Sequence, residues 1–406
     1  MQSDSSAVPP DDAPVEHRLQ FTGTGGEYFR IWIVNLLLSI LTFGIYSAWA
    51  KVRREQYFHR NTLLDGGGFD YHGDPKAILK GRIIAVALLF ILSLVEKIAH
   101  DFYYPVVLVA SPLVPWLMIR SFIFRSRNTS FRGLHFDFHG TYMGLCKAYL
   151  IPLIVLIVLS GTMAYFSEQA ALEASRQSER APYTGAILLG SMFGIFLLVP
   201  ALLYRFKAFQ FNHLAFGASR FESRFRLRSF YGIYLGVFVL LPLFAGLILA
   251  SISVGIAIWA GIETREDLFA AITVLWSILK GNEILIWSLI FLGSLIYITA
   301  LVVLPAWFAA LLTNLVWNNT RLGKHRFKSD QTLWGVSWIV VSNLLLMLIT
   351  LGLYWPWAKV RLTRYRAERA ALLAVGSLDD FVAGATREKS AIGEEVADIF
   401  DFDIAF

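Results

Sequence analysis

Two short motifs place an aspartate two residues before a histidine, at Asp70-x-His72 and at Asp137-x-His139. Two carboxylates and two imidazoles form a chemically reasonable ligand set for a metal ion. Each motif, however, belongs to a longer segment that recurs along the chain, and a recurring hairpin repeats such residues for structural reasons as well. We therefore predict no resident metal and no cofactor, and a metal at these two pairs remains the alternative.

Other residue patterns that support catalysis are not found in the sequence. The run Gly66–Gly68 is not followed by Lys-Ser or Lys-Thr and has no dinucleotide-binding context, so it is not a phosphate loop. Intramembrane carboxylates commonly carry protons or coupling ions, and here only Glu96 lies near an apolar segment. We predict that the protein is not an enzyme, and the scarcity of acidic residues disfavours a proton-coupled pump.

Long apolar segments dominate the chain and must position these residues. Of the 406 residues, 56% are hydrophobic and 16% are charged, whereas soluble proteins have about 25% charged residues. We expect spans near residues 83–95, 103–124, 141–166, 183–204, 230–260 and 284–312, and shorter apolar segments near 30–49 and 333–358. The composition predicts a membrane protein that crosses the bilayer several times.

The charges between the apolar segments are distributed unequally. Five stretches hold 26 Lys/Arg against 8 Asp/Glu, namely 51–82, 120–140, 205–229, 318–332 and 359–369. The alternate stretches 96–101, 167–182 and 261–283 hold 5 Lys/Arg against 9 Asp/Glu. Because Lys/Arg excess marks the cytoplasmic side, we predict that the basic stretches and both termini lie in the cytoplasm.

Four of the basic stretches carry a similar segment, which we interpret as a β-hairpin. NTLLDGGGFDYHG (61–73) and NTSFRGLHFDFHG (128–140) are close copies, and the segments at 212–225 and 318–330 are looser ones. A glycine in each segment supplies the turn, and a phenylalanine on each second strand faces a common side. The predicted turn glycines are Gly66, Gly133, Gly217 and Gly323, and the phenylalanines are Phe69, Phe136, Phe221 and Phe327.

One phrase occurs near each end of the chain, as LTFGIYSAWAKVRR (41–54) and ITLGLYWPWAKVRL (349–362). Taken as a simple span, 333–358 would carry its basic end to the outside, against the charge rule. We therefore predict that 30–49 and 333–358 re-enter the membrane, with turns at Thr42–Tyr46 and Thr350–Tyr354, and eight plain spans are the alternative.

The repeated phrase also supplies the candidate site residues. The two asparagines and two glycines line a path or pair helices, and the cations reach lipid phosphates. The path or pairing residues are Asn35, Asn343, Gly44 and Gly352. The lipid-headgroup residues are Lys51, Arg53, Arg54, Lys359 and Arg361.

These motifs resemble those of a known family. The opening EYFRIWIVNLLLSILTFGIYSAWAKVRREQYFHRNT, the FDYHG that follows, the closing NLLLMLITLGLYWPWAKVR and the tail GEEVADIFDFDIAF are similar to the YjgN-like family of bacterial inner-membrane proteins. The resemblance implies a multi-span protein of the bacterial inner membrane. The family has no assigned function, so the resemblance implies no substrate and no catalytic residue.

The sequence predicts an all-α polytopic membrane protein with about six full spans, two re-entrant or short spans and a small cytoplasmic layer of β-hairpins. We expect a disordered lead-in (1–20), a membrane domain (21–383) and an acidic tail (384–406). The leading hypothesis is a channel- or transporter-like protein of unknown substrate. The alternative is a non-transporting scaffold that binds anionic phospholipid and, through its tail, a protein partner. We predict no nucleic-acid partner, and the oligomeric state is not defined by the sequence.

Overall fold

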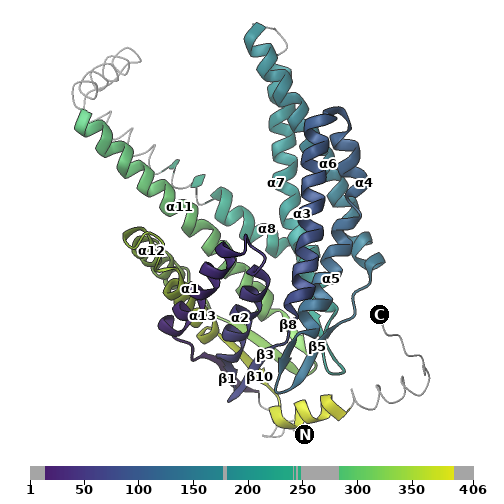
Figure 1. Cartoon of the computed structure of the whole chain (residues 1–406), viewed down its shortest axis with the longest axis vertical. Coiled ribbons are helices and arrows are strands. Elements are labelled where there is room, and N and C mark those ends of the chain that lie inside the picture. Colours follow the sequence, from purple (N-terminus) through teal and green to yellow (C-terminus); the bar gives the residue numbers. More distant parts are fainter. Residues whose placement is uncertain (1–13, 177–180, 241, 244–245, 248–282, 388–406) are drawn as a thin grey trace, which may run out of the picture. The chain divides into compact units, whose positions relative to one another are not determined.

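A computed structural model of the chain describes residues 14–176, 181–240, 242–243, 246–247 and 283–387 (Figure 1). The chain forms two compact units. The first comprises Met1–Leu227, Asn314–Asp330 and Trp355–Phe406, and the second comprises Arg228–Thr313 and Gln331–Tyr354.

The first unit contains a closed antiparallel barrel. Around the barrel the strands follow the order β1-β10-β9-β8-β7-β6-β5-β4-β3-β2, so each strand pairs with two neighbours. The strands are β1 (Val15–Phe21), β2 (Thr62–Leu64), β3 (Gly67–Tyr71), β4 (Thr129–Phe131), β5 (Leu134–Phe138), β6 (Leu214–Phe216), β7 (Ser219–Ser223), β8 (Thr320–Leu322), β9 (His325–Ser329) and β10 (Ala370–Ala374).

Four β-hairpins of equal build make up most of the barrel, each with a three-residue strand followed by a five-residue strand. All four predicted turn glycines have positive φ, which confirms the predicted turns. In the first two turns the residue before the glycine, Asp65 or Arg132, also has positive φ, as a type I′ turn requires. In the other two turns Gly217 and Gly323 come first and alone have positive φ, which is typical of a type II′ turn.

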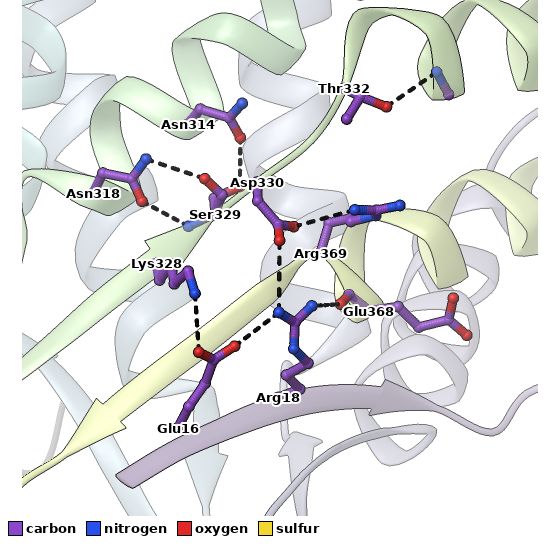
Figure 2. A network of polar contacts seen from close by, with 11 residues as sticks. Glu16, Arg18, Asn314, Asn318, Lys328, Ser329, Asp330, Thr332, Glu368 and Arg369 are labelled. Carbon is purple, nitrogen blue, oxygen red and sulfur yellow. Dashed lines mark hydrogen bonds and ion pairs between the residues drawn. The ribbon is translucent and has the colours of Figure 1, made fainter. Parts of the chain in front are cut away.

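The two ends of the described chain complete the barrel as a fifth strand pair. β1 pairs antiparallel with β10, with Glu16 opposite Leu373. Figure 2 shows the polar contacts along this seam: Glu16 accepts from Lys328 at 2.9 Å, and Arg18 forms ion pairs with Glu16 at 2.9 Å and Asp330 at 3.6 Å. The predicted boundary at residue 20 therefore falls inside β1, and the one at 384 falls inside a helix over 378–387.

Alternate side chains of each strand point into the barrel, and the side chains that point inward are mostly apolar. The predicted phenylalanines Phe69, Phe136, Phe221 and Phe327 all belong to this core. The helix over 378–387 covers the end of the barrel at which the hairpin turns lie, through Leu378, Phe381, Val382 and Ala385. Full burial of a phenylalanine contributes about 1.5–3 kcal/mol, so the aromatic interior is a main source of barrel stability.

Helices leave the opposite end of the barrel and connect the hairpins. Those of the first unit are α1 (Gly25–Leu41), α2 (Ser47–Arg60), α3 (Pro75–Ile98), η2 (His100–Phe102), α4 (Tyr103–Ala110), α5 (Leu113–Arg127), α6 (Tyr142–Arg176), α7 (Ala181–Asn212) and α13 (Trp355–Glu368). Within this unit α6 packs on α7, and α1 packs on α2 and α13 (Figure 1). The second unit holds α8 (Leu227–Leu235), η3 (Gly236–Leu240), most of α11 (Glu283–Asn318) and α12 (Leu333–Ile349).

Four helical segments in the described part of the chain are long and apolar enough to cross a membrane, by length and composition: Pro75–Ile98, Tyr103–Arg127, Ala186–Asn212 and Tyr297–Asn318. The closed barrel shows that the predicted all-α fold is wrong, and the described residues hold these four segments where about six full spans were predicted. An isolated hairpin leaves the backbone N–H and C=O groups along its two outer edges without hydrogen-bond partners. When hairpins pair edge to edge, all of these groups are satisfied only if the sheet closes into a barrel. Most of the predicted segment 230–260 lies outside the described residues.

Both copies of the repeated phrase form a helix, a short turn and a second helix. α1 ends before a turn in which Phe43 and Gly44 have positive φ, and α12 ends before a turn in which Leu351 and Gly352 do. The threonine before each turn, Thr42 or Thr350, accepts a hydrogen bond from the backbone N–H four residues later. The predicted turns are confirmed, whereas their depth in a membrane stays a prediction.

Candidate functional site

The two aspartates of the Asp-x-His motifs are bound by arginines. Arg60 Nε donates to Asp70 Oδ1 at 2.9 Å, and Arg127 Nε donates to Asp137 Oδ1 at 3.3 Å. Burial alone would raise the pKa of Asp70, but the hydrogen bonds from Arg60 and the Tyr71 backbone outweigh it and lower that pKa. The aspartates thus fasten the end of a helix to the second strand of its hairpin.

The histidines of the motifs do not complete a metal site. His72 Nε2 lies 3.0 Å from Ser130 Oγ. No group of three or more His, Cys, Asp or Glu side chains suited to a metal occurs among the residues that the structure describes.

The barrel encloses an apolar cavity of about 230 Å³, here called the inner cavity. Phenylalanine and leucine side chains form most of its wall, and the helix over 378–387 closes it. The hydroxyl of Thr320, the exception in this wall, donates to the carbonyl of Val316 at 2.7 Å. An apolar cavity of this kind does not hold water well, because water there finds no hydrogen-bond partners.

Two further cavities lie at the helical end of the barrel. The rim cavity, about 380 Å³, is bounded by the last turns of α2, α5 and α7 and includes His59, Arg125 and Gln210. The cationic pocket, about 310 Å³, lies between α2 and α5 and is lined by Lys51, Glu55 and Arg125, among others. The three cavities together extend from an apolar interior to a charged opening.

Positive charge is concentrated around the cationic pocket. Lys51 is half-buried, and burial followed by the nearby charge of Arg125 lowers its pKa. The charge of Glu55 opposes this shift, whereas Arg82 and Arg54 add to it. The single carboxylate in the wall, Glu55, forms an ion pair with Arg54 at 2.9 Å. In the described part of the chain, no carboxylate lies within ion-pair distance of Lys51 or Arg125.

Asn35 lies in a small polar pocket of about 280 Å³ together with Lys51, Arg54 and Arg82. Its side chain is buried, and within the described residues its Oδ1 has no hydrogen-bond partner. Arg82 Nη1 donates to the hydroxyl of Ser47 in the same pocket. A buried acceptor without a partner costs about 1–3 kcal/mol, so a hydrogen-bond donor in this pocket would stabilise Asn35.

The remaining predicted site residues occupy different places. Asn343 is buried in α12 of the second unit, and Gly44 and Gly352 are turn residues with open space around them. Arg53 is exposed on α2 beside Arg54, and Lys359 and Arg361 lie on α13. The structure therefore groups Asn35 with Lys51 and Arg54 in the first unit.

Sequence reasoning missed Arg82 and Arg125 as site residues. Both lie in stretches rich in lysine and arginine, 51–82 and 120–140. Nothing in their local sequence separates them from the other cations, because their place beside Lys51 depends on how α3 and α5 pack against α2.

The barrel and the apolar helices define the class of this protein, a membrane protein that combines helical segments with a closed β-barrel. The chain belongs to the family described as "Bacterial protein of unknown function (DUF898)", which it matches over residues 16–399. It is 25% identical over 374 residues to "Inner membrane protein YjgN" of Salmonella typhimurium, covering 89% of both chains. It is 24% identical over 387 residues to the proteins of the same name from Escherichia coli O157:H7 and strain K12, covering 91% of both chains.

These comparisons confirm the resemblance that the sequence motifs indicated and agree with an inner-membrane protein. No solved structure matches the chain.

Proposed function

We propose that the protein is a multi-pass inner-membrane protein that holds its barrel at the cytoplasmic face and binds anionic phospholipid there through α2 and α13. The observation that carries this proposal is the excess of cations at the helical end of the barrel. Lys51, Arg53 and Arg54 lie on α2, and Lys359 and Arg361 lie on α13.

Electrostatics favours an anionic lipid as the partner of the cations on α2 and α13. Burial followed by the charge of Arg366 lowers the pKa of Lys359, so this cation gains from a nearby anion, as Lys51 does. Each lysine or arginine near an anionic leaflet contributes about 1 kcal/mol of attraction, and long side chains reach the phosphates by snorkelling.

In this proposal the barrel is a scaffold. The apolar wall of the inner cavity supports a barrel that does not conduct polar solutes, and the equal build of the four hairpins supports an internal repeat. We further propose that the protein has no enzymatic activity, binds no nucleic acid, and offers its acidic C-terminal tail to a protein partner.

A transport function is the second candidate, and one observation favours it. The buried Oδ1 of Asn35 without a partner, in a pocket with Ser39, Ser47 and Arg82, resembles the wall of a polar path. Solute flux in proteoliposomes tests this candidate: flux that Asn35→Leu abolishes would replace the scaffold proposal, and its absence across small ions and metabolites would leave the scaffold.

The lipid proposal is tested by thermal unfolding in nanodiscs of anionic or zwitterionic phospholipid. We expect the wild-type protein to unfold several degrees higher in the anionic lipid, with the difference shrinking at high salt. Combined Arg53→Gln and Lys359→Gln should remove most of the difference. Combined Arg220→Gln and Arg326→Gln is the matched control, because these arginines lie exposed on the barrel strands β7 and β9. Equal stability of the wild type in both lipids would refute the proposal.

A further inference from the structure

The three cavities of the first unit are neighbours, and each adjacent pair has wall residues in common. The inner cavity and the rim cavity share Phe69, Phe136 and Leu214 in their walls. The rim cavity and the cationic pocket share Arg125, along with His59 and Thr129. A molecule that enters between α2 and α5 therefore has only these shared side chains between it and the centre of the barrel.

The chemistry of the walls changes along this series. The inner end is lined by aromatic and aliphatic side chains, whose burial of another apolar group is favourable by about 25 cal/mol per Å². At the outer end Lys51 and Arg125 are cations without a bound carboxylate in the described chain. Glu55 lines the same pocket but is paired with Arg54, and His59 Nδ1 donates to the Glu55 backbone carbonyl at 2.7 Å.

From this arrangement we propose that the barrel binds a single-chain anionic amphiphile. Its hydrocarbon chain occupies the rim and inner cavities, and its carboxylate or phosphate head lies between Lys51 and Arg125. A charge-assisted hydrogen bond from each cation to the head group offsets the free-energy cost of removing the head group from water. This inference goes beyond the lipid-surface proposal above, because the ligand enters the barrel rather than remaining in the leaflet.

The closed end of the barrel sets a limit on the ligand. Leu378, Phe381 and Val382 of the helix over 378–387 form the end wall of the inner cavity. Gly217 approaches Ala385 so closely that a Cβ at Gly217 would lie 2.6 Å from the Ala385 Cβ. Because this end wall is tightly packed, it limits the length of the chain that the site accepts, and the inner-cavity volume of about 230 Å³ favours one hydrocarbon chain over two.

Photo-crosslinking tests the site. The full chain is placed in zwitterionic nanodiscs with palmitic acid that carries a mid-chain diazirine, irradiated, digested and analysed by mass spectrometry. We expect adducts on barrel peptides that contain Phe136 or Leu214. Unlabelled palmitate or lysophosphatidate should compete, and competition by only one of them identifies the head group. Neutral methyl palmitate, of equal chain length, should not compete.

Two variants locate the ligand further. Leu214→Trp places a larger side chain between the inner cavity and the rim cavity and should abolish the barrel adducts. Combined Lys51→Gln and Arg125→Gln removes the two cations and should lower labelling at least tenfold. Arg120→Gln is the control, since Arg120 lies on the same helix over the Trp116 ring and lines none of the three cavities.

Adducts confined to α3, α4 and α6, which line none of the three cavities, or equal competition by methyl palmitate, would overturn the inference even if every variant failed to fold. The outcome is independent of the nanodisc unfolding experiment, in which Leu214→Trp should leave the difference between the two lipids unchanged.

Discussion

At the scale of single residues, the end of each helix is fastened to the second strand of the hairpin that follows it. In two hairpins an arginine binds an aspartate, as Arg60 does with Asp70. In the other two hairpins an asparagine takes the same place, and Asn318 Oδ1 accepts from the Ser329 backbone at 2.7 Å while its Nδ2 donates to the Ser329 carbonyl (Figure 2). Different side chains thus perform one structural task, which explains why the Asp-x-His pair is not kept in every hairpin.

His325 provides a prediction of pH dependence. Its ring is buried, and its Nδ1 accepts a hydrogen bond from the Val375 backbone N–H at 3.2 Å. The ring packs edge-on against Phe381, with 4.3 Å between the two ring centroids. Burial, and then the charge of Lys324, lowers the pKa of His325. The neutral ring is therefore favoured in the folded protein, so its contribution to stability is complete above the unfolded pKa of about 6.5 and is lost as the pH falls below it.

Thermal unfolding between about pH 8 and pH 5 measures this effect. His325→Gln keeps an acceptor but cannot take up a proton, so the variant should lose less stability on acidification than the wild type. Parallel losses in the two proteins would exclude His325 as the cause.

At the scale of elements, the hairpin turns need a backbone conformation that glycine adopts readily and other residues rarely adopt. Gly133 has φ +81° and follows Arg132, which also has positive φ. A β-branched side chain is rarely accommodated at positive φ, so Gly133→Val should destabilise the protein by about 1–3 kcal/mol, as measured by thermal or denaturant unfolding. Gly68→Ala is the control, because Gly68 has no positive φ and only ordinary contacts near a Cβ. Equal losses in both variants would show that the turn conformation is not the cause.

At the scale of the whole molecule, the ends of the described chain close the barrel without a covalent link. Glu16 and Leu373 lie directly opposite each other across the seam. Directly opposed residues of antiparallel strands are about 4.5–5.5 Å apart between Cα atoms, which suits a disulfide.

We expect Glu16→Cys with Leu373→Cys, in a Cys146→Ser background, to form an intramolecular disulfide in oxidising buffer. The crosslink closes nearly the entire chain into a loop and should stabilise the protein by about 2–4 kcal/mol, seen as a mobility shift and a higher unfolding temperature. Glu16→Cys with Lys328→Cys is the control, since β10 lies between β1 and β9 and separates the two backbones by about 9–10 Å. Efficient crosslinking of the control pair alone would contradict the observed strand order.

Orientation in the membrane is the second prediction at this scale. Lys324 is exposed at a hairpin turn of the barrel, and Asp101 lies in η2, which joins α3 to α4. The excess of Lys/Arg near the hairpins predicts a cytoplasmic barrel. In a Cys146→Ser background, Asp101→Cys should react with an impermeant maleimide on intact spheroplasts, whereas Lys324→Cys should react only after permeabilisation. The reverse labelling pattern would invert the proposed orientation.

The sequence by itself determined the features that depend on local patterns. Glycine at the turns, alternation in the second strands and long apolar segments predicted the hairpins, the interior phenylalanines and a membrane protein, because each signal lies within a few turns of the chain. The motifs of the repeated phrase also led to the correct family.

Only the tertiary structure decided how these parts combine. Hairpin edges are alike in sequence, so nothing local indicates that β1 and β10 meet and close a barrel instead of leaving an open layer. In the same way Lys51 and Arg125 come from helices far apart in the chain, and they share one pocket because α2 and α5 both end at the rim of that barrel. Contacts between distant segments depend on the global packing of the chain, which the spacing of residues along the sequence does not encode directly.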